Sequence, residues 1–314
     1  MTESSSLSTH TNFAVLANET QKLNGTYRNS DVFTILIYVA SPINLLGLIA
    51  NGIVFRFLCC GIKRTKYTVY VLNLAIADFI VLFVHMTAFA ASVMMSGTLD
   101  FTEYLYTTFD ILSFFGYDTS LFLLTAISVE RHLGVFYPLW YQYKRPKDLS
   151  PILCALLWVL SCLMTGVEYF SCWSEYISHK EQYSPACNTT TMFLSTIFLI
   201  FTPVMVICSL SLFVKIQLCQ RHSQPKSPAR LCLTIAVTVA LFLIFVVPLR
   251  LHCLILYWYP KMTFDGFLFD IFCFLNLISC SLNPFAYFLV GRQKRSVREP
   301  LHVVLQRSWK EETK

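Results

Sequence analysis

The chain of 314 residues is 55% hydrophobic and only 13% charged, and its formal net charge is +6. Soluble globular domains carry roughly 25% charged residues, so this composition excludes an ordinary soluble domain and indicates a membrane protein. The surplus of lysine and arginine falls in short loops between apolar segments, which is typical of membrane topology and not of a nucleic-acid-binding surface.

Seven apolar segments are long enough to cross a bilayer, which takes about 20 helical residues. In chain order they are 33–58, 69–94, 104–128, 151–172, 192–218, 231–258 and 264–290. These segments predict an all-α fold, a seven-transmembrane helix bundle over residues 31–291.

The two ends of the chain have a different composition. Residues 1–30 are rich in Ser, Thr and Asn and lack a periodic apolar face, which predicts an extracellular glycosylated tail. Residues 292–314 place Val297 and Leu301 at helical spacing against basic residues. That pattern predicts a short amphipathic helix on the cytoplasmic membrane surface, in contact with lipids.

Lysine and arginine concentrate in the loops after spans one, three and five, which the positive-inside rule places in the cytoplasm. They are Lys63, Arg64 and Lys66, then Lys144, Arg145 and Lys147, then Lys215, Arg221, Lys226 and Arg230. The N-terminus is then extracellular and the C-terminus cytoplasmic. The glycosylation sequons at Asn18, Asn24 and Asn188 all lie on the predicted outer side.

Cys172 and Cys187 flank the second outer loop, in an oxidising compartment. A disulfide closing a loop of this size would add about 3 kcal/mol in the chain-entropy model. The alternative from the residues alone is two free thiols.

Polar residues inside spans indicate function, because burying them in a bilayer is expensive. Asp78 lies in span two, and the other members near mid-membrane are Asn51, Ser120, Ser279 and Asn283. Oxygen atoms around one carboxylate suit a small cation such as sodium. The alternative is a hydrogen-bonded cluster that joins the helices.

Several motifs occur in order along the spans. They are Gly47 to Asn51, "NLAIAD" in span two, Glu130-Arg131-His132, Trp158, Pro203, Pro248 and "NPFAY" from Asn283 to Tyr287. This set resembles the rhodopsin-like class of G-protein-coupled receptors. The stretches "FGYDTSLFLLTAISVERHLGVFYPLWY" and "FVVPLRL" are similar to the Mas-related receptors and, among them, to the Mas receptor.

The resemblance implies roles on the cytoplasmic side. Arg131 is expected to be held by Glu130 at rest and to meet the G protein when span six swings out. Leu139 matches an apolar residue that docks into the G protein, with an interfacial membrane anchor as the alternative. Tyr287 belongs to the same coupling machinery.

Departures from the class narrow the expected ligand. Ser113 stands where aminergic receptors carry an aspartate, and Tyr106 stands where most of the class has a cysteine. The resemblance then implies a disulfide between Cys172 and Cys187. Val246 replaces the usual tryptophan of span six, so the common aromatic toggle is absent.

The resemblance also implies where the ligand binds. Glu168 lies where Mas-related receptors that bind cationic ligands carry a glutamate, whereas Thr191 replaces their second acid. Arg250 suits a carboxylate, such as a peptide C-terminus. Glu168 and Arg250 could instead pair with each other. Further pocket-rim candidates are Tyr106, Asp110, Tyr257 and Asp270.

Together these features predict a plasma-membrane receptor and not an enzyme, with no cofactor beyond an allosteric sodium ion. Its expected partners are a heterotrimeric G protein, Gq/11 with Gi as a second choice, an extracellular peptide or small charged molecule, and membrane lipids. The alternative is an ion-conducting or transporting membrane protein, because charged residues inside spans also mark ion paths. The chain lacks the inverted repeats that many transporters show.

Overall fold

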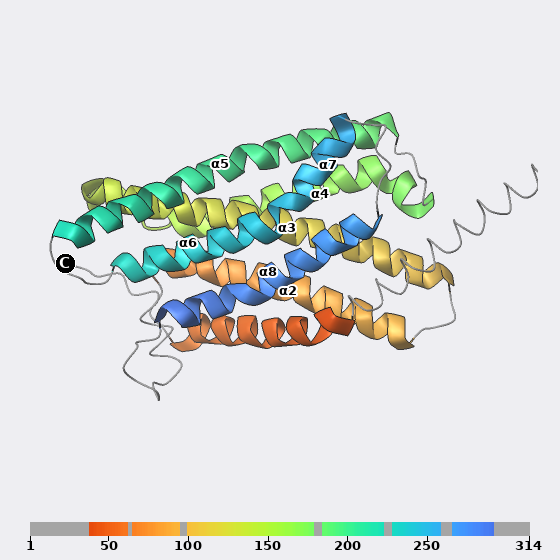
Figure 1. The fold of residues 1–314 in the computed structure, drawn as a ribbon, viewed down its shortest axis with the longest axis horizontal. Helices are drawn as coiled ribbons and strands as arrows, with labels where there is room; N and C mark the ends of the chain where they lie inside the picture. Colours follow the sequence, from red (N-terminus) through yellow and green to blue (C-terminus); the bar gives the residue numbers. More distant parts are fainter. Residues whose placement is uncertain are drawn as a thin grey trace, which may run out of the picture.

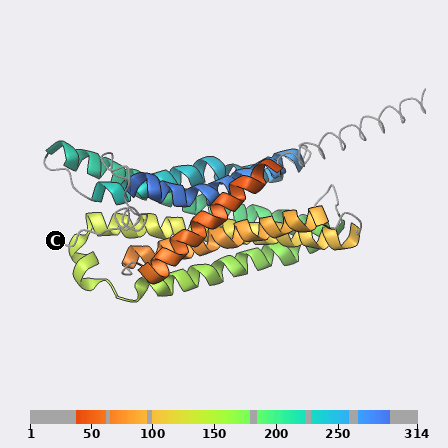
Figure 2. The ribbon, with the colours of Figure 1, turned by 90° about the horizontal axis from the view of Figure 1, so that it is seen from below.

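The computed structural model describes residues 38–61, 65–94, 99–178, 184–222, 228–258 and 266–291, with some side chains in these ranges left undefined. This described part is helical and contains no strand (Figure 1). The helices run along the long axis of the molecule, as the perpendicular view in Figure 2 also shows. The predicted all-α helix bundle is therefore confirmed.

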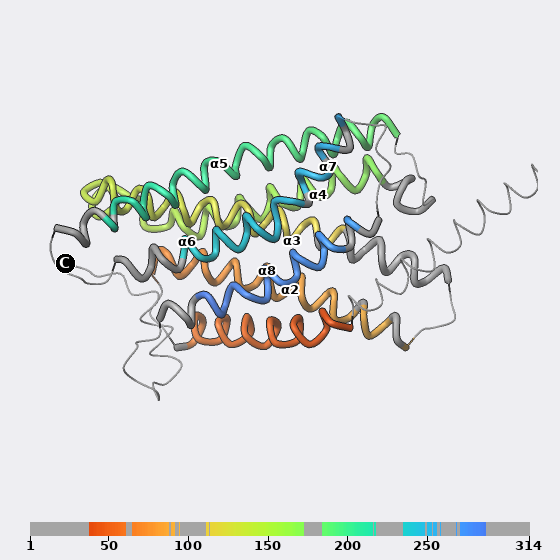
Figure 3. The backbone as a smooth tube through the Cα atoms, in the orientation of Figure 1, coloured from red at the N-terminus to blue at the C-terminus, as the bar shows by residue number. Residues whose placement is uncertain are grey.

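The helices follow the predicted spans in order. The first helix covers residues 38–56 and continues into a short π-helix, η1 (Phe57–Gly61). The others are α2 (Lys66–Met94), α3 (Leu99–Phe136), η2 (Trp140–Lys144), α4 (Leu149–Ser178), α5 (Pro185–His222), α6 (Pro228–Phe245), α7 (Val247–Trp258) and α8 (Gly266–Gly291). Figure 3 traces the same path as a tube.

Several helices are longer than the apolar segments that predicted them. The third helix, α3, continues to Phe136 and α5 to His222, beyond predicted ends at 128 and 218. Hydrophobicity marks only the part inside the bilayer, whereas a helix continues into water as long as its backbone bonds are satisfied. Within the described residues, Tyr38–Cys60, Lys66–Ala91, Leu149–Cys172 and Pro185–Lys215 are long and apolar enough to cross a membrane.

The sixth predicted span is two helices, α6 and α7, which meet at Val246. Pro248 is the reason, because proline has no backbone N–H to donate to the carbonyl four residues earlier. The span is therefore divided at Val246, which is called the hinge below, into two helical parts. The sequence analysis predicted one continuous span here.

Helix α3 lies at the centre of the bundle and packs against α2, α4, α5 and α6. Its buried side chains include Tyr117, Leu121 and Phe122, which join the main apolar core. The outer face of α4 is apolar and exposed, as a bilayer-facing surface requires. This face consists of Ile152, Leu156, Val159, Leu163, Val167 and Phe170.

Two predictions, one about each end of the chain, lie outside the described residues. They are the tail 1–30 with Asn18 and Asn24, and the amphipathic helix predicted within 292–314. The third sequon, at Asn188, is exposed in the first turn of α5.

Candidate functional site

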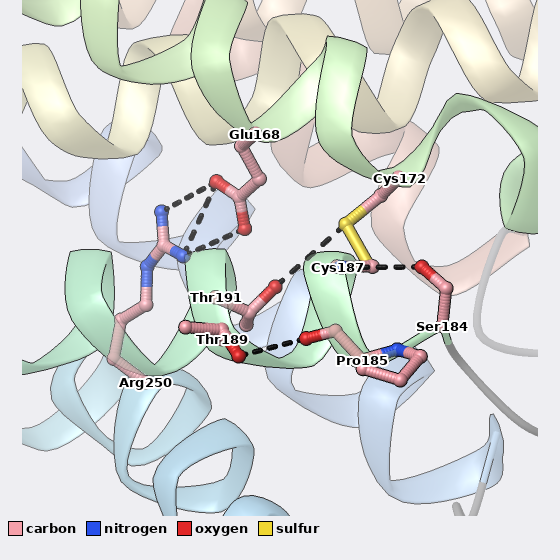
Figure 4. Close-up of a disulfide and its surroundings, with 8 residues drawn as sticks. All are labelled: Glu168, Cys172, Ser184, Pro185, Cys187, Thr189, Thr191 and Arg250. Carbon is pink, nitrogen blue, oxygen red and sulfur yellow. Dashed lines mark hydrogen bonds and ion pairs between the residues drawn. A yellow bond between two sulfur atoms is a disulfide. The ribbon is translucent and has the colours of Figure 1, made fainter.

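Three charged side chains from three helices meet in the interior of the bundle. Arg250 of α7 donates from Nη1 to Glu168 Oε1 of α4 at 3.1 Å, and from Nη2 to Glu168 Oε2 at 3.3 Å. Its Nη2 also donates to Asp118 Oδ1 of α3 at 3.2 Å. Arg250 and Asp118 are 1% exposed and Glu168 is 3% exposed. This charged triad links the third, fourth and sixth spans (Figure 4 shows the Glu168 and Arg250 part).

Aromatic rings surround the guanidinium of Arg250. Its Cζ lies 4.9 Å from the ring centre of Phe114, 5.3 Å from that of Tyr117 and 5.7 Å from that of Phe198. Aromatic ring faces attract cations. The triad is thus enclosed by rings that exclude water and favour positive charge.

The sequence analysis left two roles open for Glu168 and Arg250, and the structure pairs them with each other. Asp118 was missed. Its signal was present in "FGYDTSLF", where a single acid interrupts an apolar run inside a span. Because Asp118 lies 132 positions from Arg250, no local pattern predicts that they meet.

The disulfide predicted between Cys172 and Cys187 is present and joins α4 to α5 (Figure 4). The two Cα atoms are 4.7 Å apart. The Oγ of Ser184 accepts a hydrogen bond from the backbone N–H of Cys187 at 3.2 Å, at the start of α5. Since Glu168 lies one turn before Cys172, the bridge fixes the outer ends of the helices beside the charged triad.

Four predicted rim residues cannot be assigned to this site. Tyr106 and Asp110 lie on α3, Tyr257 on α7 and Asp270 on α8, but their side chains fall outside the described part of the structure.

A second polar cluster surrounds Asp78 on α2. Asn283 Nδ2 of α8 donates to Asp78 Oδ2 at 2.8 Å, and Ser120 Oγ of α3 donates to Oδ1 at 3.4 Å. Asn51 donates to the backbone carbonyls of Gly47 and Cys280. Ser279, the fifth predicted member, is also buried. Asp78, Ser120 and Asn283 therefore meet as predicted, whereas Asn51 joins the first helix to α8.

Near the C-terminal end of α3, Glu130 has a partner that the sequence did not predict. Arg145, in the loop after α3, donates from Nε to both carboxylate oxygens of Glu130 at 3.1 Å. Its Nη2 also binds Glu130 Oε1 and Ser150 Oγ. Tyr70 of α2 donates to Glu130 Oε1 at 3.2 Å. Glu130 therefore anchors the second inner loop to α3 and α2.

The charge of Arg145 is stabilised by this pairing. Burial disfavours a charged guanidinium, but the hydrogen bonds and negative charge of Glu130 outweigh that effect and raise the pKa of Arg145. A buried, bidentate guanidinium–carboxylate pair is also among the strongest polar contacts in proteins.

The neighbouring coupling residues are arranged differently. The Cζ of Arg131, a buried residue, lies 4.3 Å from the ring centre of Tyr67. In the loop, Leu139 is 73% exposed and Tyr143 is 75% exposed. The loop thus presents apolar side chains outward. The side chain of Tyr287 is outside the described part.

Comparison with known proteins gives consistent matches. Residues 50–287 match the family described as "7 transmembrane receptor (rhodopsin family)". The chain is 39% identical over 306 residues to proto-oncogene Mas of Rattus norvegicus, covering 94% of this chain and 91% of that protein. It is 40% identical over 284 residues to proto-oncogene Mas of Homo sapiens, covering 88% and 84%. It is 42% identical over 274 residues to Mas-related G-protein coupled receptor member H of Mus musculus, covering 85% and 80%.

Proposed function

The chain belongs to the rhodopsin family of seven-transmembrane receptors and, within it, to the Mas-related receptors, and on that premise we propose how it receives and transmits a signal. It is a multi-pass receptor of the plasma membrane and not an enzyme. An extracellular peptide or small charged molecule binds in the outer half of the bundle, and the cytoplasmic face then promotes nucleotide exchange on a heterotrimeric G protein.

The charged triad is the observation that carries the ligand proposal. Charged groups inside a membrane bundle are expensive and usually serve binding or transport. Glu168 and Arg250 carry opposite charges. The carboxylate of Glu168 suits a cationic ligand group, and the guanidinium of Arg250 suits a carboxylate. A charged ligand group that binds either residue must break their contact. Arg250 lies on α7, the helix that begins directly after the hinge at Val246. Breaking the contact between Arg250 and Glu168 would therefore change what holds this helix in place next to the hinge.

The exposed loop and the buried arginine motif support coupling on the inner side. Arg131 and Tyr287 belong to the class motifs, and Leu139 supplies an exposed apolar contact for the G protein. The loop that carries Leu139 is anchored through Arg145 to Glu130. We assign Gq/11 as the main partner and Gi as a second one, on the family resemblance.

The proposal also covers the orientation of the chain in the membrane and an ion site beside Asp78. The N-terminus and the sequons at Asn18, Asn24 and Asn188 face the outside, and the basic tail 292–314 lies on the inner leaflet. We propose that a sodium ion binds beside Asp78, and the buried Oδ1 atom of Asn283, which has no hydrogen-bond partner among the described residues, supports this proposal. Asp78, Ser120 and Asn283 would hold it through oxygen atoms.

Calcium mobilisation in cells tests the function. Cells expressing the wild type are challenged with panels of cationic and anionic peptides and small molecules, with Arg131→Ala as the uncoupled control at matched surface expression. A ligand response that Arg131→Ala abolishes supports the receptor mechanism. Loss of that response in Glu168→Gln identifies a cationic ligand group, and retention there with loss in Arg250→Gln identifies an anionic one. Ligand-independent ion currents without calcium responses would contradict the proposal.

A further inference from the structure

The charged triad contains two acids and one base, and its contacts are unequal. Glu168 receives hydrogen bonds from both terminal nitrogens of Arg250. Asp118 receives one, from Nη2. Asp118 lies on α3 and Glu168 on α4, so the bond to Asp118 joins Arg250 to a different helix from the bonds to Glu168. It can therefore persist when the contact with Glu168 is broken.

The triad also carries unbalanced charge. When both acids are ionised, two carboxylates and one guanidinium leave one excess negative charge in a group of residues that are at most 3% exposed. The second oxygen of Asp118, Oδ2, is buried and has no hydrogen-bond partner among the described residues. A buried charge without compensation is strongly unfavourable, so the site suits one additional positive group.

We propose that Asp118 is a positioning residue for ligand binding: it retains the guanidinium of Arg250 while one positively charged group of the ligand takes its place on Glu168. This inference rests on the proposed receptor function and names its ligand class, a molecule with a single cationic group at the bound end. With the ligand in place, two positive groups face two carboxylates and the excess charge disappears.

The aromatic rings around Arg250 also suit the replacement of Arg250 by a ligand cation on Glu168. Phe114, Tyr117 and Phe198 lie around Arg250 within cation–π distance. A guanidinium that moves away from Glu168 toward Asp118 stays among these rings, so it does not lose its favourable surroundings. Without Asp118, displacement from Glu168 would leave Arg250 with no carboxylate from the triad. Asp118 thus lowers the cost of freeing Glu168.

A first experiment needs no ligand. Surface expression and the thermal unfolding temperature are measured for Glu168→Gln, Asp118→Asn and the double variant. Each single variant should reach the surface and unfold near the wild-type temperature, because Arg250 keeps one carboxylate. The double variant should be lost from the surface or unfold at a much lower temperature. If Glu168→Gln alone is as damaging as the double variant, Asp118 cannot hold Arg250 and the proposal is wrong.

A second experiment measures potency. The probes are tripeptides with an acetylated N-terminus and an amidated C-terminus that each carry a single lysine. Copies with Nε-acetyl-lysine are the neutral controls, and the readout is G-protein activation. Glu168→Gln should abolish responses to the lysine probes. Asp118→Asn should raise the half-maximal concentration at least about tenfold, equivalent to about 1.4 kcal/mol. Asp118→Glu, which keeps the charge, should restore most of the potency.

The two experiments separate failure of the inference from failure of the receptor function. Unchanged potency in Asp118→Asn, with loss in Glu168→Gln, would overturn the role of Asp118 and leave the receptor function intact. Asparagine also mimics a protonated acid, so that result would mean that the negative charge of Asp118 is not used. A wild type that responds to acidic probes, or to no probe at all, would overturn the cationic ligand class, whatever the first experiment shows about Arg250.

Discussion

The hydroxyl of Tyr117 on α3 donates a hydrogen bond to the backbone carbonyl of Val246 at 2.8 Å, at the point where α6 ends and α7 begins. The ring of Tyr117 also lies 4.4 Å from that of Phe198 on α5, centre to centre. Most of the class has a tryptophan at the position of Val246. Here a tyrosine of the third span contacts the hinge of the sixth.

Tyr117→Phe should raise basal signalling. It removes only the hydroxyl that ties the hinge to α3 and keeps the ring in the core. A hydrogen bond contributes about 0.5–1.5 kcal/mol, so basal nucleotide exchange should rise roughly two- to tenfold. The measurement is GTPγS binding to membranes at equal receptor density. Tyr38→Phe, an exposed tyrosine of the first helix, is the matched control. Unchanged or reduced basal exchange would argue against a hinge role.

Arg145→Gln should destabilise the receptor. It leaves the buried carboxylate of Glu130 without its guanidinium partner, and breaking a buried pair in this way costs about 3–5 kcal/mol. Thermal unfolding of the purified receptor measures the loss. Lys144→Gln removes an exposed cation from the adjacent position and should change stability little. Equal effects of the two substitutions would show that general loop charge, and not the pair with Glu130, sets the stability.

Sodium should lower basal exchange if it binds beside Asp78. The ion would stabilise the arrangement in which α2, α3 and α8 bring Asp78, Ser120 and Asn283 together. Basal GTPγS binding should therefore rise when sodium is replaced by N-methylglucamine, and Asp78→Asn should remove this dependence. Asp148→Asn, an exposed acid of the inner loop, should preserve it. A stable wild type without any sodium dependence would favour the hydrogen-bonded cluster alone.

Removing the disulfide should weaken the outer end of the bundle. The double variant Cys172→Ala and Cys187→Ala removes the covalent link between α4 and α5, which closes a loop with a sequence separation of 15. The chain-entropy model gives this link a stabilisation of about 3 kcal/mol. Thermal unfolding with and without a reducing agent is the test. Reducing agent should lower the unfolding temperature of the wild type toward that of the double variant. Cys162→Ala, which alters an exposed free cysteine, should respond to reducing agent as the wild type does. A wild type indifferent to reduction would contradict the expected contribution.

Gly116→Ala should disturb the contact between α3 and α2. A Cβ at Gly116 would lie nearer to Cγ2 of Val81 than real Cβ atoms come to their neighbours. Overpacking of this kind costs about 1–3 kcal/mol. Gly166→Ala on α4 meets nothing within 4 Å and should be neutral or stabilising. Adding Val81→Ala to Gly116→Ala should recover part of the lost stability; failure to do so would locate the effect elsewhere than in this contact.

The features that sequence reasoning predicted correctly depend on local composition or on motifs. The apolar runs located the helices, because a bilayer requires about 20 apolar residues whatever their partners are. The motif around Asp78 and Asn283 identified two residues that lie 205 positions apart and do meet. The residues alone left open whether Cys172 and Cys187 are bridged, and the family resemblance implied the disulfide that the structure contains.

The hinge at Val246 and the length of α3 and α5 were less predictable. Pro248 was visible in the sequence, but whether a proline bends a helix or divides it depends on how neighbouring helices satisfy the freed backbone groups. Here the hydroxyl of Tyr117 binds the carbonyl of Val246, whereas the carbonyl that Pro248 leaves without its N–H donor is that of Ile244. That contact depends on the packing of α3 against the sixth span.

By itself, the sequence determined that this protein is a membrane-spanning helix bundle and which family it belongs to, because these properties follow from composition and residue order. Only the tertiary structure decided the partners of its buried charges. Arg250 is 82 positions from Glu168 and 132 from Asp118, and Glu130 binds Arg145 across a loop. Such pairings depend on the rotation and depth of each helix in the bundle, because a charge in a low-dielectric interior is stable only where an opposite charge is brought within contact distance.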